Sequence, residues 1–265
     1  MTRTALVTGA SSGIGKATAA ALMERGYRVI GTSRSPGRIT DPVAGVDYVA
    51  LDLADPASVE GMAAQLGAVD VLINNAGESQ SGPLEELPAE AVERLFRVNV
   101  FGALRLTQLA LPGMRERGYG RVIMVGSMLA SFPLAYRSSY VASKAALKGF
   151  ADAGRQELSP FGVWLTTVEP GSIATGISDR RTKYVAADSP HQDDFETMLA
   201  ALDRNERAGI TAGRVAATIV KAVEANPPKP LYAVGSNAPL VFGLRRIVPA
   251  TLVEKLTHRR HNLKR

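Results

Sequence analysis

Short apolar runs alternate with helical patterns along most of the chain. The first run, residues 4–10, precedes an Ala-rich helical pattern over residues 13–25, and Gly26 is placed to end that helix. Continuous apolar strands separated by helices are typical of a parallel sheet that helices cover on both faces. The sequence therefore predicts an α/β fold with a doubly wound parallel sheet. About seven strands are expected, at residues 4–10, 27–34, 46–55, 69–77, 120–127, 163–172 and 230–235.

The intervals between these runs carry the helical patterns. The longest pattern, residues 88–117, is expected to be interrupted near Pro112, because proline cannot donate a backbone hydrogen bond. Residues 172–209 form the longest stretch without a predicted strand and include a helical pattern at 196–205. An insertion of that kind is typically a lid or a binding loop. Since no composition break or internal repeat divides the chain, we expect one domain over residues 1–242 and a tail over residues 243–265.

The positive charge of the chain is concentrated in this tail. The 265 residues include 31 basic and 25 acidic ones, a net charge of +6, and the tail holds seven of the basic and one of the acidic residues. The rest of the chain therefore has 24 of each, so we expect no nucleic-acid partner, which would call for a basic patch on the body. In the tail, residues 249–261 place Leu252, Val253 and Leu256 on one helix face. We expect this helix to pack on the body or on a sister subunit, in preference to meeting an anionic membrane.

The residue types that bind metals are scarce. The chain has no cysteine, and its three histidines, His191, His258 and His261, are scattered. We therefore expect no metal site. The first ten residues lack the layout of a signal peptide, and no apolar run approaches the length of about 18 residues that a membrane helix needs. A soluble, cytoplasmic protein is expected.

A glycine-rich turn follows the first predicted strand and opens the first predicted helix. It reads TGASSGIG from Thr8 to Gly15, with glycines at positions 9, 13 and 15. Bare glycine backbone lets a phosphate approach closely, and the helix N-terminus offers it free N–H groups and a positive dipole end. At the first strand–helix turn of a parallel α/β sheet, such a turn indicates a dinucleotide site.

Further motifs accompany this turn in order along the chain. The spacing T-G-x-x-x-G-x-G is followed by NNAG at residues 74–77 and by Tyr140-x-x-x-Lys144. From about residue 3 to residue 235 the chain resembles the short-chain dehydrogenase/reductase family, in its branch of about 250 residues. The resemblance implies a Rossmann-like fold, a nicotinamide cofactor and a catalytic tetrad. The tetrad would consist of Asn99 in RVNVFG, Ser127 in MVGS, Tyr140 and Lys144.

Two further expectations come from the family. Its members are commonly dimers or tetramers, so a homodimer or homotetramer is expected. The segment NPPKPLYAVG, residues 226–235, resembles the branch that contains 17β-hydroxysteroid and retinol dehydrogenases. That branch often has Arg where this chain has Leu231, and the segment can equally be a Pro-rich turn before the last strand.

The tetrad suits carbonyl reduction, in which the oxygen that receives negative charge must also receive a proton. A free tyrosine has a pKa near 10, and a neighbouring cation lowers it. Residues four apart share a helix face, so Lys144 is expected beside Tyr140 or on the cofactor ribose. Ser127, at the carboxyl end of a strand, would hydrogen-bond the substrate oxygen. By the resemblance, Asn99 would hold a water that links Lys144 to solvent.

The second predicted strand ends in a way that favours NADP(H) over NAD(H). An NAD site generally places an acid there for the ribose hydroxyls, whereas this chain has Ser33 and Arg34 and no acid until Asp41. Arg34 can pair with a 2′-phosphate. The resemblance adds positions beside the adenine ring and around the nicotinamide. The predicted cofactor-binding residues are Thr8, Gly9, Ser11, Ser12, Gly13, Ile14, Gly15, Ser33, Arg34, Asp52, Leu53, Asn75, Ala76, Gly77, Tyr140, Lys144, Pro170, Gly171, Ile173 and Thr175.

These features together predict an NADP(H)-dependent oxidoreductase that acts on a small-molecule carbonyl or secondary alcohol. The substrate is expected to be lipophilic, because the segment after Ser127 is largely apolar and the insertion at 172–209 is long. A 3-oxoacyl thioester reductase and a non-catalytic NADP-binding sensor are the alternatives. Tyr184 and His191 could line a lid, although solvated loop positions are the preferred interpretation.

Overall fold

The computed structural model describes residues 2–176, 179–245 and 247–263. Its centre is a seven-stranded sheet in which every pair of neighbouring strands is parallel, in the order β11-β7-β6-β4-β1-β2-β3. The predicted α/β doubly wound sheet of about seven strands is thus confirmed. The strands are β1 (Thr4–Val7), β2 (Arg28–Ser33), β3 (Asp47–Ala50), β4 (Val71–Asn74), β6 (Gly120–Val125), β7 (Val163–Pro170) and β11 (Leu231–Val234).

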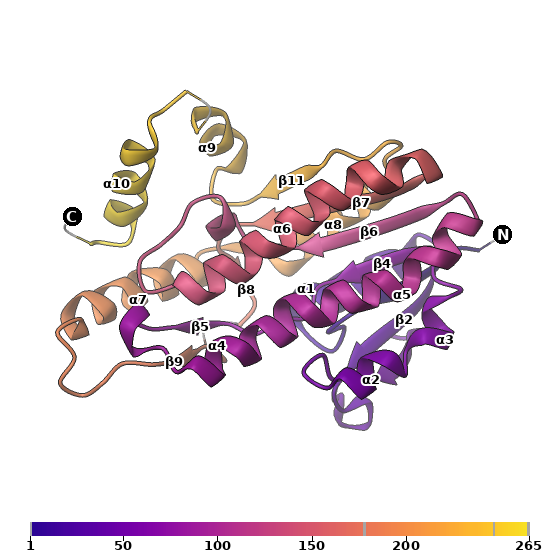
Figure 1. Ribbon diagram of the computed structural model, residues 1–265, viewed down its shortest axis with the longest axis horizontal. Coiled ribbons are helices and arrows are strands. Elements are labelled where there is room, and N and C mark those ends of the chain that lie inside the picture. Colours follow the sequence, from indigo (N-terminus) through magenta and orange to yellow (C-terminus); the bar gives the residue numbers. More distant parts are fainter. Residues whose placement is uncertain (1, 177–178, 246, 264–265) are drawn as a thin grey trace.

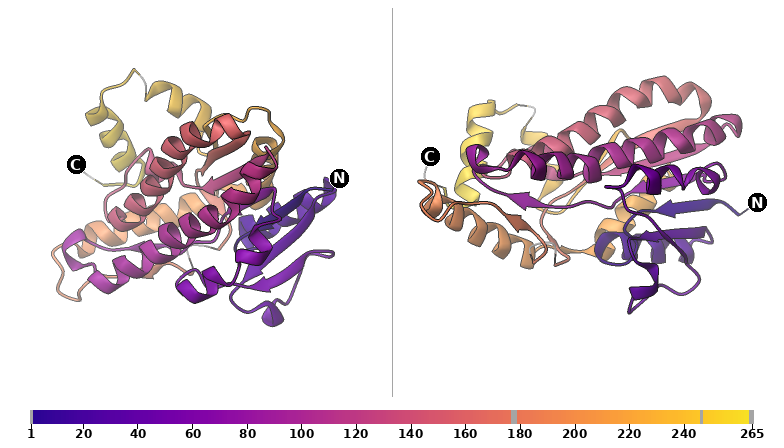
Figure 2. Two further views of the ribbon diagram at one scale, coloured as in Figure 1. Left: turned by 45° about the vertical axis from the view of Figure 1, so that its right-hand side comes forward. Right: turned by 60° about the horizontal axis from the view of Figure 1, so that its bottom comes forward.

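Helices cover both faces of this sheet (Figures 1 and 2). They are α1 (Gly13–Glu24), α2 (Pro56–Glu60), α3 (Ala63–Leu66), α4 (Ala89–Phe96), α5 (Gly102–Glu116), α6 (Ser138–Leu158) and α8 (Ala212–Glu224). Successive strand side chains point to opposite faces: Leu6 belongs to a core with α5 and α6, whereas Ala5 and Val7 belong to a core with α1 and α8. This alternation explains why the central strands are continuously apolar.

The long helical pattern at 88–117 is interrupted at a different place from the one predicted. A π-helical turn, Arg97–Phe101, separates α4 from α5, and α5 continues through Pro112. Proline removes one backbone hydrogen bond, but Leu106, Ala110 and Met114 keep α5 packed on the sheet across that point. The prediction of a break near Pro112 is therefore wrong. The π-turn contains Asn99, whose side chain hydrogen-bonds Glu78 and Ser143, and such turns often mark functional sites.

The insertion at 172–209 contains two short strands that the sequence did not predict. β8 (Ile173–Ala174) pairs with β10 (Ile210–Thr211), and β9 (Thr182–Lys183) pairs with β5 (Gln80–Ser81). Two-residue strands are too short to produce an apolar pattern, which explains the difference. The predicted helix is present and longer, as α7 (Gln192–Arg207). Short 3₁₀ turns lie at Pro36–Arg38, Leu84–Glu86, Met128–Ala130 and Ser159–Phe161.

After β11 the described residues 238–245 and 247–263 form a C-terminal arm, with α9 (Ala238–Leu244) and α10 (Ala250–Arg260). The arm and α7 lie at the side toward which the strand arrowheads point, opposite the N-terminus (Figure 1). Phe242 meets Phe132 edge to face, with ring centroids 5.1 Å apart, and Val253 packs against the same cluster. On the predicted apolar face of α10, Leu252 and Leu256 are exposed. Among the described residues, no helix has the length and apolar character to cross a bilayer.

Candidate active site

A cleft of about 1290 Å³ opens at the carboxyl ends of the strands. It runs from the glycine turn, past the ends of β2, β4, β6 and β7, to α10 of the C-terminal arm. This is the edge where ligands bind in open α/β sheets. Most of the predicted site residues line it, namely Gly9, Ser11, Ser12, Gly13, Ile14, Ser33, Arg34, Asp52, Leu53, Asn75, Ala76, Gly77, Ser127, Tyr140, Lys144, Pro170, Gly171, Ile173 and Thr175.

Three predicted site residues, Thr8, Gly15 and Asn99, lie outside this lining. Thr8 is buried and ties two strand ends together: its hydroxyl oxygen accepts hydrogen bonds from the backbone N–H groups of Asn75 and Ala76, each at 2.9 Å. Its own hydroxyl donates to the Ile73 carbonyl at 3.2 Å. Thr8 therefore fixes the backbone of Asn75 and Ala76, which line the cleft.

Gly15 is required by packing within the turn. A Cβ atom there would lie 2.2 Å from the carbonyl oxygen of Gly9 and 2.5 Å from Nδ2 of Asn75. Gly9 and Gly13 instead have positive φ angles, +67° and +54°, and face the cleft. The family motif thus combines two glycines that turn the chain beside the cleft with one that lets α1 approach β1.

The side chain of Asn99 makes three hydrogen bonds within the protein. Its Oδ1 accepts from the backbone N–H of Glu78 at 2.8 Å, and its Nδ2 donates to the Glu78 carbonyl at 3.0 Å and to Ser143 Oγ at 3.2 Å. These bonds fix the chain just after Gly77 against α6. The expectation that Asn99 holds a water for a proton relay stays a prediction.

Tyr140, Ser127 and Lys144 converge in the middle of the cleft. Tyr140 and Lys144 lie on α6, and Ser127 follows β6 and caps the next 3₁₀ turn by accepting from the Leu129 N–H at 3.2 Å. Ser127 also hydrogen-bonds to Tyr140. Lys144 is buried, and its Nζ donates to the Val125 carbonyl at 2.9 Å.

The electrostatics of Tyr140 differ from the expectation. Burial raises its pKa above the ordinary value, while Arg137 and the Ser127 hydrogen bond act to lower it. The Lys144 ammonium lies 5.9 Å from the ring centroid, and burial lowers the pKa of that ammonium to about 8. The cation that acts most strongly on Tyr140 is therefore Arg137, which was not predicted from the sequence.

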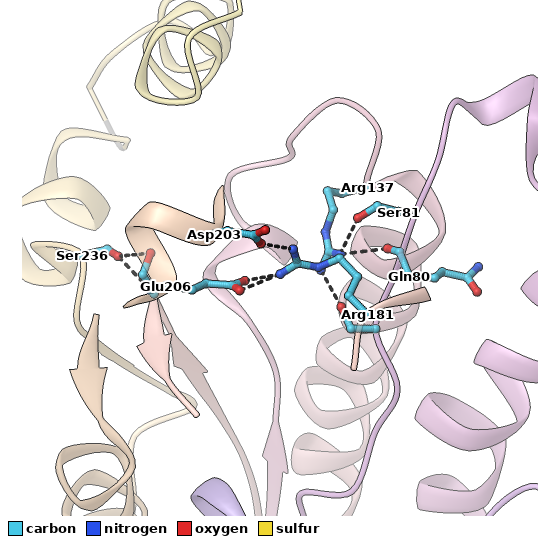
Figure 3. Close-up of polar contacts among 9 residues, drawn as sticks. Gln80, Ser81, Arg137, Arg181, Asp203, Glu206 and Ser236 are labelled. Carbon is cyan, nitrogen blue, oxygen red and sulfur yellow. Dashed lines mark hydrogen bonds and ion pairs between the residues drawn. The ribbon is translucent and has the colours of Figure 1, made fainter. Parts of the chain in front are cut away.

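Arg137 belongs to a buried polar cluster beside the cleft (Figure 3). It immediately precedes α6, and its guanidinium carbon lies 4.3 Å from the centroid of the Tyr140 ring. An arginine three residues before the family tyrosine was the one available signal, but it could not be separated from an exposed loop cation. The sequence predicted that the tail helix packs on the body or on a sister subunit, but not that Val253, Thr257 and His261 of the arm line the cleft.

The end of β2 presents two cations to the cleft, Arg34 and the unpredicted Arg38. The Arg34 side chain is 70% exposed, and its Nη1 lies 4.0 Å from Oε1 of Glu78, whose carboxylate is also held by Arg94 at 2.7 Å. Asp41, the first acid after β2, pairs with Lys16 and lies outside the cleft lining.

Tyr184 and His191, the two residues considered for a lid, lie in different places relative to the cleft. Tyr184 lines the cleft, contrary to the preferred interpretation of a solvated loop position. His191 lies outside it, with Nε2 at 2.7 Å from Oε1 of the exposed Glu85. Among the described residues, no group of three or more His, Cys, Asp or Glu side chains is arranged to hold a metal ion.

Comparison with known proteins places the chain in a family. The short chain dehydrogenase family matches residues 3–185. A 3-ketodihydrosphingosine reductase from Bacteroides thetaiotaomicron is 35% identical over 230 residues, covering 84% of each chain. Retinol dehydrogenase 8 from Homo sapiens is 34% identical over 208 residues, covering 74% of this chain and 67% of that protein, which confirms the predicted likeness to retinol dehydrogenases.

A solved structure supports the same family. A short chain dehydrogenase from Burkholderia cenocepacia, determined in complex with NADP, superposes with a TM-score of 0.77 at 27% identity and covers 99% of this chain and 98% of that one. Because the family match spans most of the chain and includes the glycine turn, NNAG and Tyr140-x-x-x-Lys144, the protein belongs to the short-chain dehydrogenase/reductase family of NAD(P)-dependent oxidoreductases.

Proposed function

We propose that the protein is an NADP(H)-dependent oxidoreductase that transfers hydride between the nicotinamide and a carbonyl or secondary alcohol on a lipophilic substrate. One observation carries this proposal: Tyr140, Ser127 and Lys144 share a single cleft with the glycine turn and with Arg34. A reacting carbonyl beside Tyr140 would therefore lie in the same space as a dinucleotide anchored at the turn.

The residues present fit a dinucleotide. The backbone at Gly9 and Gly13 and the N-terminus of α1 would hold its phosphates. A Cβ on Gly77 would lie 3.0 Å from Asn99 Oδ1 and 3.5 Å from Lys144 Nζ, so glycine keeps this part of the cleft open for a ribose beside Lys144. When bound, the cofactor supplies or accepts the hydride.

The preference for NADP(H) is supported by charge. Arg34 and Arg38 line the end of the cleft where the adenosine ribose would lie, together with the hydroxyl of Ser33. An acid there would hold ribose hydroxyls, whereas a guanidinium pairs with a 2′-phosphate through two hydrogen bonds. The exposed Arg34 can reach such a phosphate by giving up only its long contact with Glu78.

In the reduction direction, Tyr140 would donate its hydroxyl proton to the substrate oxygen as that oxygen gains negative charge. The Ser127 hydroxyl would hydrogen-bond the same oxygen and hold it at the tyrosine. The buried Lys144 ammonium, 5.9 Å from the centroid of the Tyr140 ring, would bind a ribose hydroxyl. Asn99 acts indirectly, by fixing the chain at Glu78.

The far end of the cleft supports a lipophilic substrate. Its wall is shared between the turn after β6 and the C-terminal arm. The apolar side chains there are Leu129, Phe132, Val241, Leu244, Val253 and Leu256, and the arm adds the polar or charged Arg245, Thr257, Arg260 and His261. Such a wall favours an alkyl or ring system over a sugar. The names of two relatives, a 3-ketodihydrosphingosine reductase and a retinol dehydrogenase, also refer to lipophilic molecules.

The proposal is tested by following NADPH oxidation over ketones and aldehydes of increasing chain length, steroids and 3-oxoacyl thioesters. We expect turnover that is lost in Tyr140→Phe, a preference for NADPH over NADH, and a reversal of that preference in Arg34→Asp. A wild-type preference for NADH that Arg34→Asp leaves unchanged would refute the cofactor assignment. Turnover of thioesters far above free ketones would favour the thioester reductase, and tight NADPH binding without any turnover would favour the sensor.

A second comparison tests the substrate class. Leu256→Arg places a charge on the apolar wall, so kcat/KM should fall more for long-chain than for short-chain carbonyls. Leu240→Arg is the matched control, because Leu240 is an exposed leucine of the same arm that does not line the cleft. Equal losses for short and long substrates in Leu256→Arg would contradict a binding role for the arm.

A further inference from the structure

Arg137 is a buried cation in direct contact with the ring of Tyr140. Only 2% of its surface is exposed, and its Cζ lies 4.3 Å from the ring centroid, nearer than Nζ of Lys144 at 5.9 Å. Burial lowers the pKa of Arg137 to about 10, so that the guanidinium remains protonated at neutral pH. At neutral pH a positive charge therefore lies over the aromatic face of the proposed proton donor.

The hydrogen bonds of Arg137 go to neutral oxygens. Its Nη1 donates to the Gln80 carbonyl and to Ser81 Oγ, each at 2.9 Å, and its Nη2 donates to Ser79 Oγ at 3.0 Å. These acceptors lie on or next to β5, which fixes the guanidinium between β5 and α6 (Figure 3). Neutral acceptors orient a cation without cancelling its charge, so its field acts on the adjacent ring.

A second buried arginine holds the carboxylates of the neighbouring helix. Arg181 pairs with Asp203 at 2.7 Å and with Glu206 at 2.6 Å, both on α7. The charges that act on Tyr140 are thus Arg137 and Arg181, which favour the phenolate, and Glu206, which opposes it. Lys144 lies on the same helix as Tyr140, farther from the ring. Arg137 is the strongest of these charged influences.

We propose that Arg137 is a positioning residue for the reaction, because its guanidinium, stacked on the Tyr140 ring, stabilises the phenolate that Tyr140 becomes when it donates its proton. This inference rests on the proposed function, in which Tyr140 is the acid. The cost of forming a phenolate in a buried site is large, and a cation within 4–6 Å typically offsets it by about one to three pKa units. Arg137 supplies this charge from outside the family tetrad.

The direct test is to measure the ionisation of Tyr140 in Arg137→Met. An ultraviolet difference titration, wild type minus Tyr140→Phe, reports this one tyrosine among seven, and the same subtraction is made in the Arg137→Met background. We expect the pKa of Tyr140 to rise by about one unit or more when the charge is removed. Arg137→Lys keeps a cation near the ring, so it should restore most of that shift.

Arg155→Met is the matched control. Arg155 is also a buried arginine on α6, its Cζ lies 4.5 Å from the Trp164 ring, and it donates to the Leu165 carbonyl at 2.9 Å, but it does not line the cleft. Its removal should cost stability and leave the Tyr140 titration unchanged. If Arg137→Met fails to fold, Arg137→Gln removes the charge while keeping hydrogen-bonding capacity. An unchanged Tyr140 titration in the folded neutral variant would overturn the proposal.

Activity provides a second readout with a defined sign. Alcohol oxidation needs Tyr140 as the phenolate base, so its rate rises with pH through the pKa of Tyr140. Arg137→Met should move that rise to higher pH by the titrated shift and slow ketone reduction about tenfold at neutral pH. Because the titration needs no substrate, it tests Arg137 even if no carbonyl reacts, whereas absence of turnover in the wild type refutes the proposed function alone.

Discussion

Replacing Gly15 by alanine tests whether the last glycine of the turn serves packing or the cofactor. The added Cβ would lie 2.2 Å from the carbonyl oxygen of Gly9, 2.8 Å from its carbonyl carbon and 2.5 Å from Nδ2 of Asn75, whereas ordinary contact begins near 3.4 Å. Two of these atoms belong to the backbone of the turn. The turn or the first residues of α1 must therefore move by roughly 1 Å or more.

The cost follows from this displacement. Overpacking of a well-packed region typically costs about 1–3 kcal/mol, and the upper end applies here because the nearest atoms are backbone and cannot rotate away. For a chain of this size, about 3 kcal/mol lowers Tm by roughly 6–12 °C. The displaced atoms include Gly9, whose N–H donates to Thr32 Oγ1 at 3.3 Å and whose backbone faces the cleft. Affinity for the dinucleotide should fall as well.

Thermal unfolding and NADPH titration, each compared with wild type, measure the two effects. Gly37→Ala is the control, because a Cβ at that position meets no atom within 4 Å and the φ of Gly37 is not positive. We expect Gly37→Ala to melt within about 2 °C of the wild type. If Gly15→Ala melts like Gly37→Ala and loses only dinucleotide affinity, Gly15 serves the cofactor directly and the packing argument is wrong.

Three further substitutions probe the support of the site. Thr8→Val leaves the N–H groups of Asn75 and Ala76 without their acceptor, and should lower the unfolding free energy by about 1–3 kcal/mol and weaken NADPH binding; unchanged urea unfolding would contradict this. Lys148→Met removes the ammonium 3.1 Å from the fully buried Glu169, at a cost of about 3 kcal/mol that a second substitution, Glu169→Gln, should partly reverse. Burial lowers the pKa of Lys144 from 10.5 to about 8, so the unfolded chain binds this proton more tightly and folding becomes more favourable as pH rises between these values. From pH 8 to pH 10 the wild type should therefore gain roughly 2 kcal/mol relative to Lys144→Met, and parallel stability curves would refute this burial effect.

The fold was predictable because its signals are local and repeated. The seven main strands appear in the sequence as apolar runs, since both faces of a parallel sheet are covered and both sets of side chains must be apolar. The π-turn at Arg97–Phe101 was not predicted, because it changes the backbone hydrogen-bond pattern without changing the helical spacing of apolar residues. The strands β5, β8, β9 and β10 were missed since pairs of two residues carry no periodicity.

The cleft was predictable where a motif ties a residue type to one position. Gly9, Gly13, Ser127, Tyr140 and Lys144 all reach it. What the sequence could not supply was the distinction between a motif residue that faces the ligand and one that supports its neighbours, as Thr8, Gly15 and Asn99 do. That distinction depends on side-chain direction, which a pattern does not encode.

Arg137 and Arg181 were missed because each makes its contacts across a large separation in the sequence. Arg137 is fixed by acceptors at residues 79–81, and β5 pairs with β9, which follows directly on Arg181. Arg181 in turn binds Asp203 and Glu206 of α7. The insertion at 172–209, which also lines the cleft through Tyr184 and Leu202, is therefore joined to Arg137 through one buried polar cluster. Under the proposed function, a change in that insertion would alter both the acidity of Tyr140 and the fit of the substrate, so the two properties are expected to vary together among variants of α7.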